Sequence, residues 1–311
     1  MNKATFTMVV GIPGSGKSTW LEEHKKELNF TIHSSDSIRA ELLDDINNQS
    51  KNDLVFKTLH KRIKEDLLNC KNVAYDATNL SRKRRINFLN NELRDIPCEK
   101  ICVLFATPYG ICLNNNGYRE RKVPEEVIRR MYLNFECPCE QEGWDNIQIV
   151  YWDYKKDGLE FNITEDLCEW TKIKHDNPHH TLSIGEHMLK AEDYYYEMDV
   201  DHKPFLYDVI AMHDCGKPFT KSFVDKDENI TTRARFYEHH NVGSYLSLFY
   251  LKELGYSDEE ILYGSLLINL HMRYFMAWKD SDKSKEKDRR LFGDNVISDL
   301  EIINACDLAA H

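Results

Sequence analysis

The residues GIPGSGKST, from Gly11 to Thr19, have the types and the spacing of a loop that binds phosphate. The glycines allow a tight turn in which backbone N–H groups point toward phosphate oxygens. Lys17 would bring a full positive charge to the β- and γ-phosphates, and Ser18 would offer its hydroxyl to Mg²⁺. An apolar strand pattern, TFTMVV, precedes the loop, and a helical pattern follows it. The segment predicts binding of ATP and Mg²⁺ by Gly11, Gly14, Ser15, Gly16, Lys17, Ser18 and Thr19.

Two aspartates come at the ends of further strand patterns. Asp36 follows NFTIH, and Asp76 ends NVAYD. Because the carboxyl ends of parallel strands face the ligand crevice, Asp36 could accept the proton of an attacking hydroxyl, and Asp76 is assigned to the nucleotide site. Arg39, three residues after Asp36, could share one face of the next helix. The alternative is that Ser35 or Asp36 only caps that helix.

Basic residues follow at two places in this half. The run RKRR at residues 82–85 begins a predicted helix beside the crevice, where it could steer phosphate or form a solvated face. Arg119 and Arg121 lie on a loop before the helix of VPEEVIRRMY. Mobile arginines neutralise charge on a transferred phosphoryl group, although an exposed surface loop is an equal alternative.

The C-terminal half carries a different set of side chains. His213 and Asp214 are neighbours in AMHDCGK, at the end of an apolar helical pattern. Imidazole and carboxylate together suit Mn²⁺, Fe²⁺, Co²⁺, Ni²⁺, Zn²⁺ or Mg²⁺. Because neighbouring side chains on a helix diverge by about 100°, a shared metal must lie off the helix end or bridge to other helices.

The elements that must position these residues differ between the two halves. Five strand patterns alternate with helical ones up to Trp152, which predicts a parallel sheet flanked by helices. From about Glu165 helical periodicity dominates and predicts an all-α region, with DSDKSKEKDRR as a solvated loop between the last two helices. A length of 311 residues favours two domains, which we place at 1–158 and 159–311. The strand patterns are TFTMVV, NFTIH, NVAYD, ICVLFA and NIQIVYW.

Composition narrows the class of protein further. The formal net charge of −11 argues against a protein that coats nucleic acid, but it allows a local basic groove. Nine scattered cysteines, an odd number, favour reduced thiols over a disulfide framework. The chain lacks an apolar run of membrane-spanning length and the layout of a secretory signal, so we expect a cytoplasmic protein without membrane association.

Four segments, GIPGSGKSTW, SSDSIRA, DATNLSRKRR and RERKVPEEVIRRMY, occur in this order. Over roughly residues 1–155 they resemble the kinase module of polynucleotide kinases of the phage RNA-repair type, an α/β P-loop domain. Small-metabolite kinases share a similar Asp-x-Thr-Asn segment, so a small acceptor stays open. The resemblance implies Lys17 and Ser18 for ATP and Mg²⁺, Asp36 for activating a 5′-hydroxyl, Arg39 for substrate phosphate, and Arg119 or Arg121 as the lid arginine.

The helical half resembles the HD phosphohydrolase superfamily over roughly residues 165–311, in GEHMLKA, AMHDCGKP, EHHNVGS, INLHMRY and NACDLAA. The resemblance implies two metal ions bridged by Asp214, suited to phosphoester hydrolysis. Lys217 could bind substrate phosphate or be a surface charge. His180 competes with His187, and His239 with His240; a metal-free HD fold is the alternative for the whole half. The implied ligands are His187, His213, Asp214, His240, His271 and Asp307.

A kinase module joined to an HD module resembles the bifunctional enzymes that heal nucleic-acid ends. It implies a 5′-hydroxyl polynucleotide kinase with a phosphohydrolase that removes 3′-phosphate or 2′,3′-cyclic phosphate from RNA or DNA, before a ligase acts. The basic segments 82–85, 119–122 and 129–130 could grip strand ends. One alternative is a nucleoside or small-metabolite kinase fused to an HD nucleotide phosphohydrolase. The other is an ATP-binding switch that regulates the HD hydrolase.

Overall fold

The computed structural model describes residues 3–119, 121–178 and 181–311, and the chain forms two compact units. One unit comprises residues up to 131 together with 138–154, and the other comprises 132–137 together with 155–311. The division after residue 154 lies near the expected boundary between 158 and 159, whereas the sequence did not indicate that 132–137 joins the second unit. The two predicted domains, as independently folding pieces, stay a prediction.

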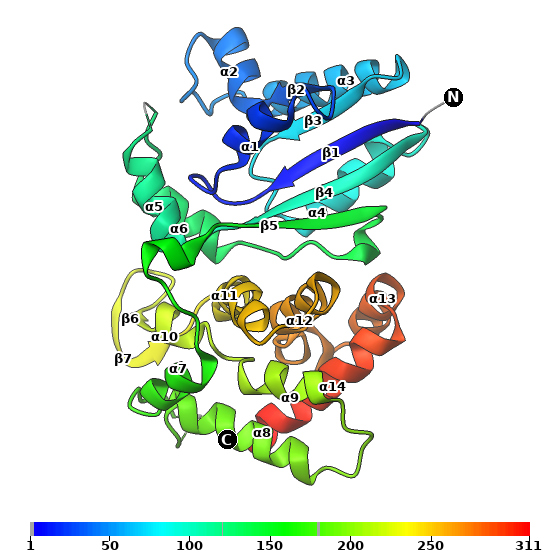
Figure 1. Cartoon of the computed structure of the whole chain (residues 1–311). Coiled ribbons are helices and arrows are strands. Elements are labelled where there is room, and N and C mark those ends of the chain that lie inside the picture. The colour runs from blue at the N-terminus through cyan, green and yellow to red at the C-terminus, as the bar shows by residue number, and fades with distance from the viewer. Residues whose placement is uncertain (1–2, 120, 179–180) are drawn as a thin grey trace. The chain divides into compact units, whose positions relative to one another are not determined.

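The first unit is built on one parallel sheet of five strands (Figure 1). The strand order is β2-β3-β1-β4-β5, and every neighbouring pair is parallel. The central strand β1 is buried along nearly its whole length, as expected when helices cover both faces of a sheet. The parallel α/β fold predicted for this half is therefore confirmed. The strands are β1 (Ala4–Val10), β2 (Phe30–Ser34), β3 (Asn72–Asp76), β4 (Cys98–Ala106) and β5 (Asn146–Tyr151).

Helices begin just beyond the carboxyl ends of the strands and so bring side chains to one edge of the sheet. The first helix begins at Lys17, after the glycine-rich loop. Ser34 caps the second helix, because its hydroxyl accepts a hydrogen bond from the Asp36 N–H at 3.3 Å, so Asp36 is not the cap residue. The helices are α1 (Lys17–His24), α2 (Ser35–Leu43), α3 (Asn52–Leu68), α4 (Arg82–Asn87), η1 (Phe88–Glu92), α5 (Tyr109–Gly117), α6 (Glu125–Leu133) and η2 (Glu140–Glu142).

A buried ion pair ties α4 to the turn η2. The Arg85 guanidinium donates to the two carboxylate oxygens of Glu142 at 2.7 and 2.6 Å, and both side chains are almost completely buried. The Arg82 Nε lies 3.7 Å from the same carboxylate. Arg82 and Arg85 are therefore buried in the core, so neither of the two alternatives, a solvated face or phosphate steering, applies to these two residues.

Replacing Glu142 with Ala is expected to lower the free energy of unfolding by about 3–5 kcal/mol, because the buried charge of Arg85 would lose its carboxylate and keep only the Asn79 and Leu80 carbonyls. Chemical denaturation followed by circular dichroism measures this loss. Glu140→Ala, in the same turn but exposed, is the matched control and should change stability by less than about 0.5 kcal/mol. Equal effects of the two substitutions would show that the ion pair is not important for stability.

The second unit is mainly helical (Figure 1). Helices α11 and α12 are buried around most of their circumference, as expected for the centre of a helical unit. Capping boxes fix two helix starts, with Ser183 and Glu186 at α8 and Ser257 and Glu260 at α12. The elements are η3 (Tyr154–Asp157), α7 (Ile163–Trp170), α8 (Ile184–Glu197), α9 (Pro204–Ala211), α10 (Lys217–Thr220), α11 (His239–Glu253), α12 (Asp258–Leu270), η4 (Tyr274–Trp278), α13 (Asp282–Phe292) and α14 (Asp294–Ala309).

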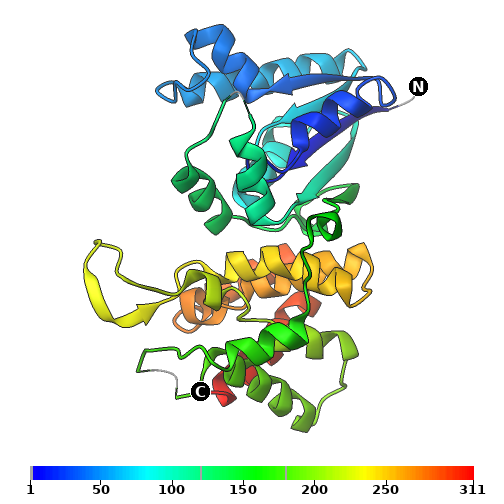
Figure 2. The ribbon, with the colours of Figure 1, turned by 60° about the vertical axis from the view of Figure 1, so that its left-hand side comes forward.

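This unit departs from the sequence-based prediction at two places. An antiparallel hairpin of β6 (Ser222–Val224) and β7 (Ile230–Arg235) extends from the helices in Figure 2, so the all-α prediction was incomplete. The expected solvated loop DSDKSKEKDRR instead contains most of α13. Ser281 caps that helix, and buried Asp288 accepts hydrogen bonds from Arg273 at 2.8 Å and Trp278 at 2.9 Å. The many charged residues of this segment predicted a solvated loop, but the segment forms an amphipathic helix.

Among residues 3–119, 121–178 and 181–311, no helix combines the length and the apolar character that a membrane span requires.

Candidate active sites

The glycine-rich loop of the first unit has the backbone that phosphate binding requires. Gly14 and Gly16 have φ values of 84° and 93°, a region that side chains other than glycine rarely adopt. A Cβ on Gly14 would also lie 2.1 Å from the carbonyl oxygen of Cys112. The Gly11 N–H donates to the Thr78 carbonyl at 3.1 Å, and the assignment of Gly11 to the nucleotide site stays a prediction.

Lys17 is folded back over this loop. Its ammonium donates to the Ile12 carbonyl at 2.7 Å and to the Ser15 hydroxyl at 3.2 Å, and the side chain is buried. Burial, with a smaller contribution from the charge of Arg119, lowers the pKa of Lys17 to about 8, against the opposing effect of Asp76. A phosphate group bound over the loop would replace these neutral oxygens as the partner of the Lys17 ammonium and would favour the charged form of the lysine.

Ser18 and Asp76 form a pair suited to Mg²⁺. The Ser18 hydroxyl donates to the Asp76 carboxylate at 3.2 Å, and burial raises the pKa of that carboxyl group. Hydroxyl and carboxylate oxygens are ligands that Mg²⁺ accepts while it keeps bound water and substrate phosphates. These two residues fit the ion that a phosphate-binding loop implies.

The carboxylate of Asp36 accepts hydrogen bonds from two arginines. Arg39 donates to its Oδ1 at 2.8 Å and also to Asn52 at 3.0 Å. Arg121 donates to its Oδ2 and to Asn47 at 3.0 Å. Arg121 thus contacts the expected base, whereas the charge of Arg119 acts on Lys17, so the two loop arginines have different neighbours.

These side chains line one open pocket of about 1220 Å³. Its lining includes the predicted residues from Gly14 to Thr19, Asp36, Arg39, Asp76, Arg119 and Arg121. Lysine and arginine outnumber aspartate and glutamate there by seven to three, although the whole chain has a net charge of −11. The pocket is therefore a local basic groove suited to an anionic ligand. The basic residues are Lys17, Arg39, Arg84, Arg119, Arg121, Lys122 and Arg130, and the acidic ones are Glu23, Asp36 and Asp76.

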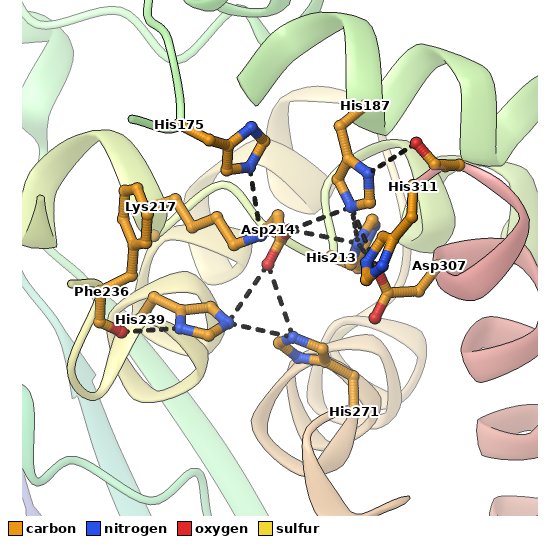
Figure 3. Close-up of polar contacts among 12 residues, drawn as sticks. His175, His187, His213, Asp214, Lys217, Phe236, His239, His271, Asp307 and His311 are labelled. Atoms are coloured by element: carbon orange, nitrogen blue, oxygen red, sulfur yellow. Dashed lines mark hydrogen bonds and ion pairs between the residues drawn. The ribbon is translucent and has the colours of Figure 1, made fainter. Parts of the chain in front are cut away.

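The second unit holds a buried cluster of imidazoles and carboxylates centred on Asp214 (Figure 3). On one side, the His187 Nε2 lies 3.2 Å from Asp214 Oδ2 and 3.1 Å from Asp307 Oδ1. His213 Nε2 lies 3.4 Å from the same Asp214 oxygen. On the other side, His239 Nε2 lies 3.2 Å from Asp214 Oδ1. His271 completes that side, with its Nε2 at 3.6 Å from Oδ1.

Backbone carbonyls orient all four rings of the cluster. The Nδ1 atoms lie 2.7–3.3 Å from carbonyl oxygens, which fixes Nδ1–H as the donor and leaves Nε2 facing inward. Facing Nε2 atoms are only 3.2–3.3 Å apart, an arrangement that needs a proton or a cation between the lone pairs. The ring-to-carbonyl pairs are His187 with Ala310, His213 with Ile210, His239 with Phe236, and His271 with Ile268.

The cluster fits two divalent ions that share one carboxylate. One oxygen of Asp214, Oδ2, faces His187 and His213, and His187 also lies near Asp307. The other oxygen, Oδ1, faces His239 and His271. Burial of a carboxylate would raise its pKa, but the neighbouring positive groups hold the pKa of Asp214 well below its usual range. Nitrogen and oxygen donors of this kind suit first-row metals such as Mn²⁺, Fe²⁺, Co²⁺, Ni²⁺ or Zn²⁺.

The structure brings His239, and not His240, to Asp214, contrary to the choice made from the sequence. Glu238 has a φ of 59°, and helix α11 begins immediately after it at His239. The turn of about 100° per helical residue then directs His240 away, and its Nε2 lies 3.7 Å from Glu238. His180 lies outside the described residues, and the preferred His187 is in the cluster.

Replacing His239 with Ala is expected to weaken binding of Mn²⁺ by at least about tenfold, because one nitrogen ligand is removed. His240→Ala is the matched neighbour and should leave the amount of bound metal unchanged. Elemental analysis of the purified variants, after dialysis against Mn²⁺, measures both effects. A loss in His240→Ala with full metal in His239→Ala would restore the ligand set chosen from the sequence.

Lys217 and His175 extend the cluster on a third side (Figure 3). The Lys217 ammonium pairs with Asp214 and lies 3.3 Å from His175 Nε2. Burial, together with the charge of Lys217, lowers the pKa of His175 to about 4, so this ring is neutral and can accept from the lysine. Lys217 is therefore not an exposed charge at a helix end. No motif marked His175, which lies far from Lys217 in sequence.

Residues 6–138 match a family described as AAA domain. Over 185 residues the chain is 27% identical to L-seryl-tRNA(Sec) kinase of Methanococcus maripaludis, covering 55% of this chain and 71% of that protein. Over 152 residues it is 25% identical to protein kti12 of Schizosaccharomyces pombe, covering 45% of this chain and about half (54%) of that protein. With the loop geometry, these matches support a kinase-like P-loop domain in the N-terminal half.

Three of the solved structures that align with the chain have TM-scores below 0.5. A kinase from Chloroflexus aurantiacus has a TM-score of 0.42 at 11% identity, covering 55% of this chain and 98% of that one. A gluconokinase from Sinorhizobium meliloti 1021 has a TM-score of 0.36 at 16% identity, covering 49% and 84%. A chain of the Pnkp1/Rnl/Hen1 complex has a TM-score of 0.34 at 20% identity, covering 40% and 42%.

Proposed function

We propose that the first unit is an ATP-dependent kinase that phosphorylates the 5′-hydroxyl end of a nucleic acid. The observation that carries this proposal is the single basic pocket shared by Lys17, Ser18 and Asp36. A triphosphate on the loop would place its terminal phosphate between Lys17 and the side of the pocket where Asp36 lies. L-seryl-tRNA(Sec) kinase of Methanococcus maripaludis acts, by its name, on an aminoacylated RNA, which supports an RNA-sized acceptor.

The kinase step needs little covalent chemistry from the protein. Asp36 accepts the proton of the acceptor hydroxyl once an arginine has moved away from it, and the hydroxyl oxygen attacks the terminal phosphorus. Lys17 and Arg119 balance the negative charge of the transferred group and of the leaving diphosphate. Ser18 and Asp76 would hold Mg²⁺, which would offset the negative charge of the phosphates.

We propose that the second unit is an HD-type phosphohydrolase that removes 3′-phosphate or 2′,3′-cyclic phosphate from the same class of ends. Its support is the Asp214-centred cluster, with carbonyl-oriented imidazoles on both sides of one carboxylate. Two divalent ions bound there would supply an activated hydroxide and charge stabilisation. Lys217, aligned by His175, holds a substrate phosphate oxygen. A ligase that consumes the repaired ends is the partner that this pair of activities would serve.

Incubation with γ-labelled ATP, Mg²⁺ and a short 5′-hydroxyl oligonucleotide tests the kinase proposal. Label should appear at the 5′ end with the native chain and be absent with Lys17→Ala. Transfer to free nucleosides or sugars, without transfer to RNA or DNA, would replace the proposal with a small-molecule kinase. ATP binding without transfer to any acceptor would favour a nucleotide switch. The same oligonucleotide with a 3′-phosphate or 2′,3′-cyclic phosphate, incubated with Mn²⁺, tests the hydrolase.

A further inference from the structure

The structure divides the run RKRR into residues with different surroundings. Arg82 and Arg85 are buried against Glu142, while Lys83 and Arg84 are exposed. Of the two exposed residues, Arg84 lines the basic pocket and Lys83 does not. No hydrogen bond or ion pair joins Arg84 to another residue among those described. Arg84 is therefore a guanidinium that faces the pocket and is available to a ligand.

An aromatic side chain from α3 lines the same pocket as Arg84. Phe56 lines the same pocket and is only half-buried. Its ring centroid is 6.3 Å from that of His60, and the His60 Nε2 lies 3.3 Å from the Tyr75 hydroxyl. Burial raises the pKa of Tyr75, and the charge of nearby Arg84 partly opposes that rise. Phe56 on α3 and Arg84 on α4 are thus both linked to Tyr75 of β3, and α3, β3 and α4 together contribute one wall of the pocket.

The sheet order puts this wall on the acceptor side of the pocket. The phosphate-binding loop follows β1, whereas Asp36 follows β2 and α4 follows β3. Strands β2 and β3 lie on one side of β1, and β4 and β5 on the other. A hydroxyl that reacts beside Asp36 therefore brings the rest of its molecule over β2, β3 and α3. Arg39 already contacts Asp36 and Asn52, whereas Arg84 has no hydrogen-bond or ion-pair partner among the residues that the structure describes.

We propose that Arg84 and Phe56 form an acceptor subsite for a single-stranded nucleic-acid end. Phe56 stacks on the terminal base, and Arg84 binds the first phosphodiester after the reacting nucleotide. A partly exposed aromatic ring and a guanidinium in one pocket are the combination that binds single strands with little dependence on base sequence. A sugar, or a nucleoside without phosphate, would use at most half of this subsite. The inference rests on the proposed kinase function and names the part of the acceptor that the kinase recognises.

Steady-state kinetics with a 5′-hydroxyl trinucleotide and the full chain test the subsite. Arg84→Ala and Phe56→Ala are each expected to raise KM for the trinucleotide by about tenfold, while kcat and the KM for ATP change less than about twofold. The effect of Arg84→Ala should shrink as salt is added, because the contact is to phosphate. Lys83→Ala, the exposed neighbour outside the pocket, should match the native chain. Equal KM values for Arg84→Ala and Lys83→Ala, or a loss confined to ATP, would overturn the subsite.

Binding of the same labelled trinucleotide, followed by fluorescence anisotropy without ATP, separates this inference from the kinase proposal. Native protein that binds the strand, with an about tenfold loss in Arg84→Ala, supports the subsite even when no phosphate is transferred. Phosphate transfer with unaltered strand affinity in both variants leaves the kinase intact and rejects the subsite. Native protein that neither binds nor phosphorylates the strand rejects both.

Discussion

The Asp36→Asn variant is expected to lose phosphoryl transfer by about 10²–10⁴-fold in kcat while it binds ATP as the native chain does. The amide keeps the size of the carboxylate but cannot accept the proton of the acceptor hydroxyl. Because the hydrogen bonds of Lys17 and Ser18 do not involve Asp36, the triphosphate should still be held. Single-turnover transfer from labelled ATP gives the rate, and calorimetry gives the affinity for ATP.

Asp53→Asn is the matched control for this experiment. Asp53 is an exposed carboxylate in the first turn of α3 and does not line the pocket, so transfer should stay within about twofold of native. If Asp36→Asn transfers phosphate at the native rate, then Asp36 is not the base. If native protein and Asp36→Asn both bind ATP and neither transfers phosphate, the loop acts as a nucleotide switch.

The Asp214→Asn variant is expected to lose affinity for Mn²⁺ by more than about 100-fold and to lose metal-dependent hydrolysis with it. Loss of an outer partner of a metal ligand already costs about 10–100-fold, and Asp214 contacts imidazoles on both of its sides. Elemental analysis should fall from about two ions per chain to none, since one carboxylate serves both positions.

Asp193→Asn, an exposed carboxylate on the same helix as His187, controls for the loss of one negative charge. It should keep its metal and its hydrolase activity. Circular dichroism of Asp214→Asn distinguishes a lost site from a lost fold. A well-folded Asp214→Asn chain that still holds about two ions would show that the cluster is not organised by this carboxylate.

The fold and the phosphate-binding loop of the first unit could be predicted from the sequence because their patterns are local. A strand, a glycine turn and a helix start lie within about twenty residues, and each leaves its own pattern. The pairing of Arg121 with Asp36 joins residues 85 positions apart, so no spacing rule could choose between Arg119 and Arg121. The core role of Arg85 was hidden in the same way, because its partner Glu142 lies on a distant turn.

In the helical unit, the motifs could be found from the sequence, but the directions of individual side chains could not. Most residues of the cluster could be named from short motifs, but which of two adjacent histidines turns inward depended on the backbone at Glu238. A positive φ there shifts the start of α11, and periodicity does not reveal such a shift. His175 had no local signal at all, since its importance comes only from contact with Lys217. The hairpin β6–β7 was missed because two short strands resemble a polar loop.

The two arginines that contact Asp36 would also limit hydrolysis of ATP by water in the proposed kinase. A carboxylate that lacked these partners and lay beside a bound triphosphate would activate water. ATP would then be hydrolysed without transfer of phosphate to an acceptor. With Arg39 and Arg121 on its oxygens, Asp36 has little attraction for a neutral water molecule. In the proposed kinase we expect an anionic acceptor to attract Arg121 away from Asp36, so that the carboxylate becomes a base only when the acceptor is bound.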